Sequence, residues 1–233
     1  MTSTFTRLAV FDLDNTLLDG DSDVLWGEFL MDQGILERAE FGPLNIEMER
    51  SYHAGTVSAE AFCSFFVATL KLKSMAGWEP LRREFLSTVI APRIGQAARD
   101  LVQRHRHSGD LLLMSTATNR FITELTAAHL GCEHLIATEC EQVGGRFTGH
   151  TTGVLNMREG KVQRLHTWLA ERGLTLGECD SVFYSDSAND LPLLNAVKHP
   201  VAVNADARLA AVAAERGWPT LCLDPTSPIA VAP

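Results

Sequence analysis

An apolar run near the start of the chain ends in two acids, Leu8-Ala9-Val10-Phe11-Asp12-Leu13-Asp14-Asn15-Thr16. Such a run is typical of a buried parallel strand, and open α/β sheets bind their ligands at the carboxyl ends of those strands. Side chains alternate along a strand, so Asp12 and Asp14 share one side. Two carboxylates this close repel each other, and Mg²⁺, which prefers oxygen ligands, would relieve that repulsion. The alternative is a solvated turn, because Asp and Asn are common turn residues.

The chain after residue 94 alternates between strand and helix patterns, which predicts a parallel α/β sheet of the doubly wound kind. Glycines around residues 144–149 and 152–155 indicate a β-hairpin within this region. Strands are expected at 111–116, 134–138, 181–185, 200–203 and 220–223, and helices at 95–107, 120–130, 162–172, 190–196 and 207–216.

The segment between Gly20 and Ala91 carries helical patterns and no convincing strand. Helices are expected from Val24 to about Gly34 and over 44–54, 58–72 and 79–90. We therefore predict two parts. Residues 1–19 and 92–233 form a Rossmann-like core, and residues 20–91 form an inserted helical cap. The tail 225–233 is expected to be loosely ordered.

The composition favours a small-molecule partner. The net charge of -9 argues against a nucleic-acid or anionic-membrane surface, because phosphates would be repelled. The five cysteines are scattered, which suits reduced thiols better than a disulfide framework. The first residues lack the hydrophobic region of a signal peptide, and no apolar run approaches the roughly 18 residues of a membrane helix. We expect a cytoplasmic protein, a monomer or homodimer, without nucleic-acid or membrane partners.

A second acidic cluster, Asp186-Ser187-Ala188-Asn189-Asp190, again follows an apolar strand and opens a helix. Asp186 and Asp190 can both face the strand ends of a parallel sheet, where they would complete an oxygen site for Mg²⁺ with Asp12. The alternative is an N-cap followed by an acid in the first helical turn.

A hydroxyl cluster and a lysine occupy similar places. Ser115-Thr116-Ala117-Thr118-Asn119 ends the second core strand before a helix. The N–H groups at a helix start favour an anion, and a Ser or Thr hydroxyl adds a donor, although the same residues also serve as helix caps. Lys161 begins the helix after the hairpin. A lysine at such a place is ordinarily solvated.

These four features, in this order, resemble the phosphatases of the haloacid dehalogenase superfamily. Asp12-Leu13-Asp14-Asn15-Thr16 matches the Asp-x-Asp-x-Thr first motif, and Asp186-Ser187-Ala188-Asn189-Asp190 matches the acids of the fourth. Thr116 (or Ser115) matches the hydroxyl of the second motif, and Lys161 the lysine of the third. A cap between motifs one and two is the arrangement of the phosphoserine-phosphatase-like branch, subfamily IB with a helical C1 cap. That branch includes histidinol-phosphatase-like members.

The resemblance implies a mechanism in which Asp12 attacks phosphorus and forms an aspartyl-phosphate. Mg²⁺ would be held by Asp12, the backbone carbonyl of Asp14, and Asp186, while Asp190 orients Lys161 or metal-bound water. Mg²⁺, Lys161 and the Thr116 hydroxyl would neutralise the phosphate charge. The metal-site residues are thus Asp12, Asp14, Asp186 and Asp190. The substrate-binding residues are Thr116, Asn119, Lys161, Asn189 and Asp21.

Asp14 indicates the reaction class. An alkoxide leaving group must be protonated and the attacking water deprotonated, and a second acid can do both. A halide leaving group needs no proton, so Asp14 favours hydrolysis of phosphate esters. Two alternatives stay open: a phosphotransferase that uses the same aspartyl-phosphate, and a non-catalytic regulatory domain that binds Mg²⁺ or phosphate.

The cap favours an amine-bearing substrate. In phosphoserine phosphatases a cap glutamate binds the serine ammonium and a cap arginine its carboxylate. Asp21 stands in the acidic position here, and residues 62–67 show no arginine. A substrate carboxylate would lack its partner. This predicts a phosphomonoester with an amine and without a carboxylate, such as histidinol phosphate.

Overall fold

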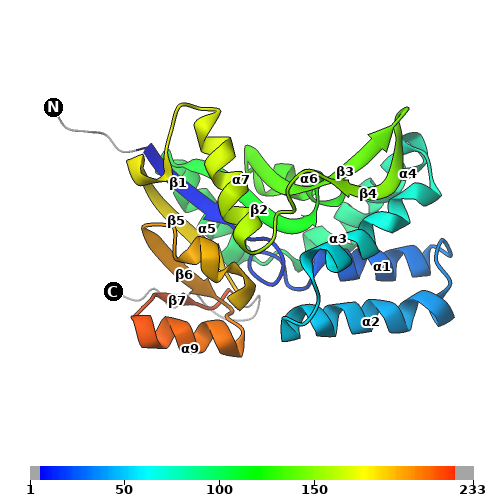
Figure 1. The fold of residues 1–233 in the computed structure, drawn as a ribbon, viewed down its shortest axis with the longest axis horizontal. Helices are drawn as coiled ribbons and strands as arrows, with labels where there is room; N and C mark the ends of the chain where they lie inside the picture. Colours follow the sequence, from blue (N-terminus) through cyan, green and yellow to red (C-terminus); the bar gives the residue numbers. More distant parts are fainter. Residues whose placement is uncertain (1–5, 224–233) are drawn as a thin grey trace.

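A computed structural model describes residues 6–223, and its centre is one seven-stranded sheet (Figure 1). The strand order is β4-β3-β2-β1-β5-β6-β7, parallel throughout except for the antiparallel pair of β3 and β4. The order reverses at β1, which confirms the predicted doubly wound sheet. The predicted loose tail lies outside the described residues. The strands are β1 (Thr6–Phe11), β2 (Leu111–Asn119), β3 (His134–Val143), β4 (Arg146–Thr152), β5 (Cys179–Ser185), β6 (His199–Val203) and β7 (Thr220–Leu221).

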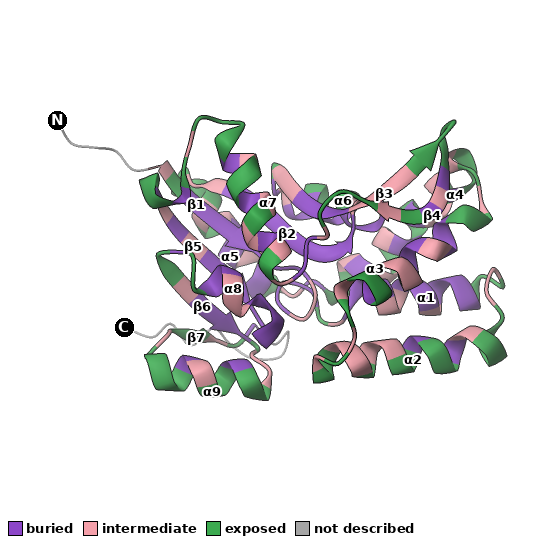
Figure 2. Ribbon diagram, in the orientation of Figure 1, coloured by how far each residue is buried: buried purple, intermediate pink, exposed green. Residues whose placement is uncertain are grey.

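The last four residues of β1, from Leu8 to Phe11, are buried on both faces of the sheet (Figure 2). Ala9 and Phe11 belong to the hydrophobic cluster that α5 and α6 complete, whereas Leu8 and Val10 belong to the cluster on the side of α7, α8 and α9. Alternation along the strand thus supplies two cores from one apolar run. The helices are α5 (Gln96–His107), α6 (Arg120–Leu130), α7 (Glu159–Ala170), α8 (Leu191–Leu194) and α9 (Ala207–Arg216), with a short helix η4 (Leu176–Glu178) before β5 and η5 (Ala188–Asp190) before α8.

The segment between β1 and α5 is helical, as predicted, and its described residues carry no named strand. Trp26, Trp78 and Phe85 lie in the same buried cluster as Phe11 of the sheet, so much of this segment is packed onto the core. A separate cap domain therefore stays a prediction. The helices are α1 (Ser22–Asp32), α2 (Arg38–Ala54), α3 (Ala59–Val67) and α4 (Met75–Phe85), with short helices η1 (Ala68–Leu72), η2 (Leu86–Ile90) and η3 (Ala91–Arg93).

The predicted hairpin was placed a few residues too late. Its first strand is the extension of β3 to Val143, which pairs with Arg146 at the start of β4. Gly144 and Gly145 form the turn, both with positive φ of 58° and 73°. Two consecutive residues of this conformation make the turn that matches the twist of a hairpin, and glycine adopts it without strain.

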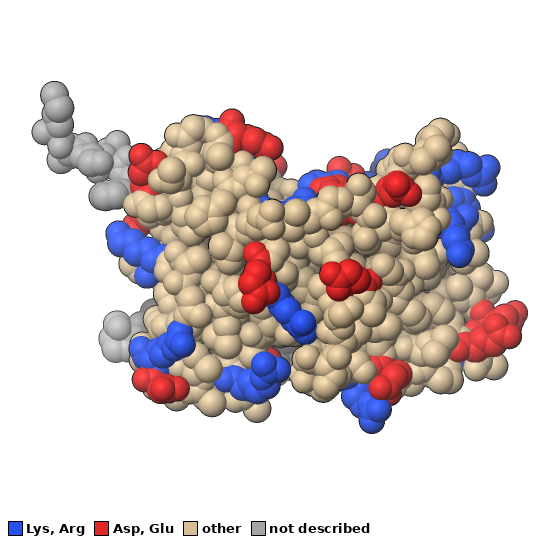
Figure 3. All heavy atoms as spheres, viewed as in Figure 1, with Lys and Arg blue, Asp and Glu red and all other residues tan. Residues whose placement is uncertain are grey.

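The molecular surface carries both signs of charge. On the face drawn in Figure 3, acidic and basic side chains are interspersed. In the part of the chain that the structure describes, no helix has the length and apolar character needed to cross a bilayer.

Candidate active site

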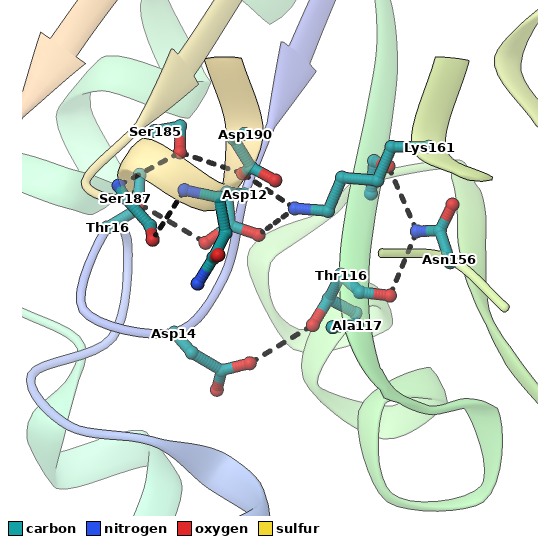
Figure 4. Close-up of polar contacts among 12 residues, drawn as sticks. Asp12, Asp14, Thr16, Thr116, Ala117, Asn156, Lys161, Ser185, Ser187 and Asp190 are labelled. Carbon is teal, nitrogen blue, oxygen red and sulfur yellow. Dashed lines mark hydrogen bonds and ion pairs between the residues drawn. The ribbon is translucent and has the colours of Figure 1, made fainter. Parts of the chain in front are cut away.

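Asp12 and Asp186 meet at the carboxyl ends of β1 and β5, as predicted. The backbone N–H of Asp12 donates to the carbonyl of Tyr184 over 2.9 Å, which fixes the first residue after β1. The Thr16 hydroxyl lies 3.3 Å from Asp12 Oδ2 and 3.1 Å from Asp186 Oδ1, and it accepts a hydrogen bond from the Asp186 N–H (Figure 4). Asp12 is 6% exposed and Asp186 is 7% exposed. Thr16 belongs to the motif quoted above, but its position between Asp12 and Asp186 could not be predicted from the sequence.

Lys161 joins the two acidic clusters. Its ammonium lies 2.7 Å from Asp12 Oδ1 and 2.7 Å from Asp190 Oδ2, and Asp190 also accepts a hydrogen bond from Ser185 (Figure 4). Lys161 is only 2% exposed, so it is not the solvated surface lysine of the alternative interpretation. Gly160 allows this placement, because a Cβ there would lie 2.0 Å from the Leu155 carbonyl oxygen.

The site carries an excess of negative charge. Burial raises the pKa of Asp12 to about 7, although Lys161 acts in the opposite direction. Burial also raises the pKa of Asp186, and repulsion from Asp12 and Asp190 adds to it. Burial alone would lower the pKa of Lys161, but Asp12 and Asp190 raise it, which keeps the ammonium charged. One ammonium faces three carboxylates, so a bound divalent cation would stabilise this arrangement.

Asp14 faces the end of β2. Its Oδ2 accepts hydrogen bonds from the Thr116 hydroxyl over 3.0 Å and the Thr118 hydroxyl over 2.9 Å, and its Oδ1 accepts one from the Ser22 N–H over 2.7 Å (Figure 4). The sequence reasoning missed Thr118, which shares a strand face with Thr116 two residues away.

The predicted metal site, made of Asp12, the Asp14 carbonyl and Asp186 with Asp190 behind them, stays a prediction. Within residues 6–223, no group of three or more His, Cys, Asp or Glu side chains is arranged to hold a metal ion. Asp14 bonds to hydroxyls and Asp190 to Lys161, which leaves Asp12 and Asp186 facing Thr16. Two carboxylates with backbone oxygens, waters and a substrate phosphate are a usual magnesium environment, so the residues present still fit that ion.

Thr116 and Ser115 point to opposite sides of β2. Thr116 faces Asp14, while the Ser115 hydroxyl accepts a hydrogen bond from Asn156 Nδ2 over 3.1 Å. The same amide donates to the carbonyls of Thr116 and Ile136, so Asn156 ties the end of β2 to its neighbour. Of the two predicted hydroxyls, Thr116 is the one beside the acids.

We expect Thr116→Ala to lower kcat/KM by roughly 10- to 100-fold, about 1.4 to 2.8 kcal/mol of transition-state binding, because a phosphate donor beside Asp14 is lost. Ser115→Ala should change kcat/KM by less than about 3-fold and act on stability instead, at about 1 kcal/mol, because Asn156 loses one acceptor. Steady-state kinetics and urea unfolding of both variants measure this split. Equal losses of activity would contradict it.

Asn119 and Asn189 have different surroundings. The Asn119 side chain caps α6, because its Oδ1 accepts from the Ile122 N–H, and its Nδ2 donates to Asp23 Oδ1 over 3.2 Å. Asn119 therefore serves as a helix cap, and its contact with the substrate stays a prediction. Asn189 lies near Asp190, accepts a hydrogen bond from Arg158 Nε over 3.3 Å and donates to the Tyr52 carbonyl over 3.4 Å.

Asp21 lies beside the site but also caps a helix. Its Oδ1 accepts from the N–H groups of Asp23 and Val24, at the start of α1. Burial raises the pKa of Asp21, and repulsion from Asp14 is the next cause. Burial likewise raises the pKa of Asp23, with repulsion from Asp21 and Asp14. A cation placed near these carboxylates would relieve that repulsion.

Comparisons with known proteins show the family of this chain. A histidinol-phosphatase of Neisseria meningitidis is 43% identical to this chain, over 92% of this chain and 98% of the length of that protein. A phosphoserine phosphatase of Mycobacterium tuberculosis is 34% identical over 91% of this chain and 70% of its own. A crystal structure of a protein of unknown function from Bordetella pertussis has a TM-score of 0.89 and 42% identity, over 93% of this chain and 98% of that one. The family model of the haloacid dehalogenase-like hydrolases matches residues 9–195, and the chain belongs to that family.

Proposed function

We propose that this chain is a Mg²⁺-dependent phosphatase that hydrolyses a small phosphomonoester through an aspartyl-phosphate on Asp12. The observation that carries the proposal is the pairing of Lys161 with Asp12 over 2.7 Å inside a buried, acid-rich site. A carboxylate held this way is oriented for attack on phosphorus, and the paired ammonium offsets the charge of the incoming phosphate. The names of the Neisseria and Mycobacterium relatives support the same activity.

The chain's own residues divide the reaction into two steps. Asp12 forms a bond to phosphorus as the ester P–O bond breaks, and Asp14 gives the leaving alkoxide a proton. Asp14 then takes a proton from water, whose oxygen attacks phosphorus and frees Asp12 and phosphate. Lys161 and Thr116 bind the phosphoryl oxygens. Asp12, Asp186 and the Asp14 carbonyl would hold Mg²⁺, which would supply positive charge for the anionic ester.

The surroundings of Asp14 support an amine-bearing substrate. Asp21 and Asp23 are 5% and 1% exposed, and both lie close enough to Asp14 to repel it. An ammonium on the leaving alcohol would offset these charges, whereas a carboxylate would add to them. Histidinol phosphate carries an amine and no carboxylate, so we propose this class of substrate ahead of phosphoserine.

The test is phosphate release from a panel of metabolite phosphates, with Mg²⁺ and with EDTA, including histidinol phosphate and phosphoserine. We expect release that requires Mg²⁺, with histidinol phosphate the better substrate. Equal or faster release from phosphoserine would contradict the proposed amine preference. If an added alcohol is phosphorylated and less free phosphate forms, the protein is a phosphotransferase instead. A folded protein that turns over none of the esters would contradict the proposed phosphatase activity.

A further inference from the structure

The last turn of α2 lies beside the acidic site, although α2 itself is on the outside of the molecule. In Figure 1 this helix lies against α1, with its C-terminal end directed toward the sheet. Figure 2 shows α2 mostly exposed or half-buried, and its buried residues are Gly42 and Asn45. Fewer residues of α2 than of α1 are buried, so burial holds α2 less firmly than it holds α1.

Two side chains, from Arg158 and Asn189, donate hydrogen bonds to the end of α2 and to the residues that follow it. Arg158, directly before α7, donates from Nη2 to the carbonyl of Val57 over 3.2 Å and lies 3.5 Å from that of Gly55. Its Nε donates to Asn189, whose amide in turn donates to the Tyr52 carbonyl. A guanidinium is well placed there, because the C-terminal end of a helix carries partial negative charge.

Tyr52 belongs to the same turn and is half-buried. Its ring packs on Phe62, with the ring centroids 4.5 Å apart, and joins the small apolar cluster around Phe62 and Phe66. Burial raises the pKa of Tyr52, and repulsion from Asp190 and Asp12 adds to it. The turn is thus held by apolar packing on one side and by the hydrogen bonds of Arg158 and Asn189 on the other.

We infer that Arg158 is a positioning residue that fastens the last turn of α2 beside the acidic site, and that substrate binding depends on this fastening. Only the expected change in KM depends on the proposed phosphatase function; the fastening of the turn does not. Arg158 also links the turn to the catalytic lysine, because its carbonyl accepts a hydrogen bond from the Lys161 N–H over 3.1 Å. Arg158 thus connects the last turn of α2, Asn189 and the helix that carries Lys161.

The backbone of Arg158 offers a way to separate this role from a structural one. The backbone φ of Arg158 is 53°, a value that residues other than glycine rarely adopt. Arg158→Gly would relieve this strain while removing the guanidinium. If the residue served only the fold, the glycine variant would be at least as stable and equally active.

The experiment compares Arg158→Gly with the wild type by thermal unfolding, hydrogen exchange and kinetics. We expect that the unfolding temperature of Arg158→Gly does not fall and that amide exchange at residues 50–57 is about 10-fold faster. KM should rise about 10-fold while kcat changes less, because the fastened position of the turn is less populated. Arg158→Lys should recover part of both effects. Arg50→Ala is the matched control on the same helix, since Arg50 pairs with Glu47 and its side chain is 75% exposed.

Unchanged exchange at residues 50–57 would overturn the inference, whether or not the protein shows phosphatase activity, because exchange is measured without substrate. An increase of KM confined to substrates with a carboxylate, without faster exchange, would make Arg158 a substrate clamp instead. If Arg158→Gly does not fold, Arg158→Lys supplies the same two measurements.

Discussion

Asp12→Asn should lower kcat by at least roughly 10⁴-fold, because the amide cannot attack phosphorus and the remaining groups only bind the substrate. Asn has nearly the same shape as Asp, and Lys161 keeps its partner Asp190 at 2.7 Å. Burial raises the pKa of Asp12 to about 7, which shows that the buried charge is unfavourable, so the neutral amide should not destabilise the fold. Phosphate release and thermal unfolding measure the two effects.

The matched control is Asp180→Asn at the opposite end of β5. Asp180 pairs there with Lys198 and His199, and its side chain is 37% exposed. We expect this variant to keep its activity, since Asp180 lies near the start of β5, whereas the site lies beyond its last residue, Ser185. Residual turnover above about one tenth of the wild type in Asp12→Asn would remove Asp12 from the role of nucleophile.

Local patterns were enough to predict the parallel sheet, although not the position of the antiparallel hairpin of β3 and β4. The apolar run before Asp12 determines a buried strand by itself, because few other structures accommodate consecutive apolar residues bounded by acids and turns. Parallel strands bring their carboxyl ends to one edge, so Asp12 and Asp186 could be expected together from two short motifs. Lys161 needed the joint pattern, because nothing local distinguishes a buried lysine at a helix start from a solvated one.

Other features depended on contacts between distant segments. Ser115 and Thr116 are adjacent hydroxyls, and only the strand register decides which of them faces Asp14. The sequence does not show that Asn119 caps α6 and also donates to Asp23, because Asp23 lies 96 residues away. The role of Arg158 could not be predicted from the sequence, because its partners Gly55 and Val57 lie about a hundred residues away, just after α2.

The role of Asp14 gives the last prediction, since it depends on the leaving group. Asp14→Asn should lower kcat for an alkyl phosphate by roughly 10³-fold, because an alkoxide needs the proton that Asp14 supplies. The fold should be kept: the amide oxygen can accept from the Ser22 N–H, and the Thr116 and Thr118 hydroxyls can rotate to accept from the new NH₂ group.

An activated aryl phosphate separates the two halves of the reaction. Nitrophenolate leaves without a proton, so Asp14→Asn should release the first equivalent of nitrophenol within about 10-fold of the wild-type rate. The second half still needs Asp14 to deprotonate water, so the aspartyl-phosphate should accumulate and later turnovers should slow. Rapid mixing would then show a burst of one nitrophenol per enzyme, which Asp12→Asn should lack. Equal losses on the alkyl and aryl esters, without a burst, would show that Asp14 acts through substrate binding rather than proton transfer.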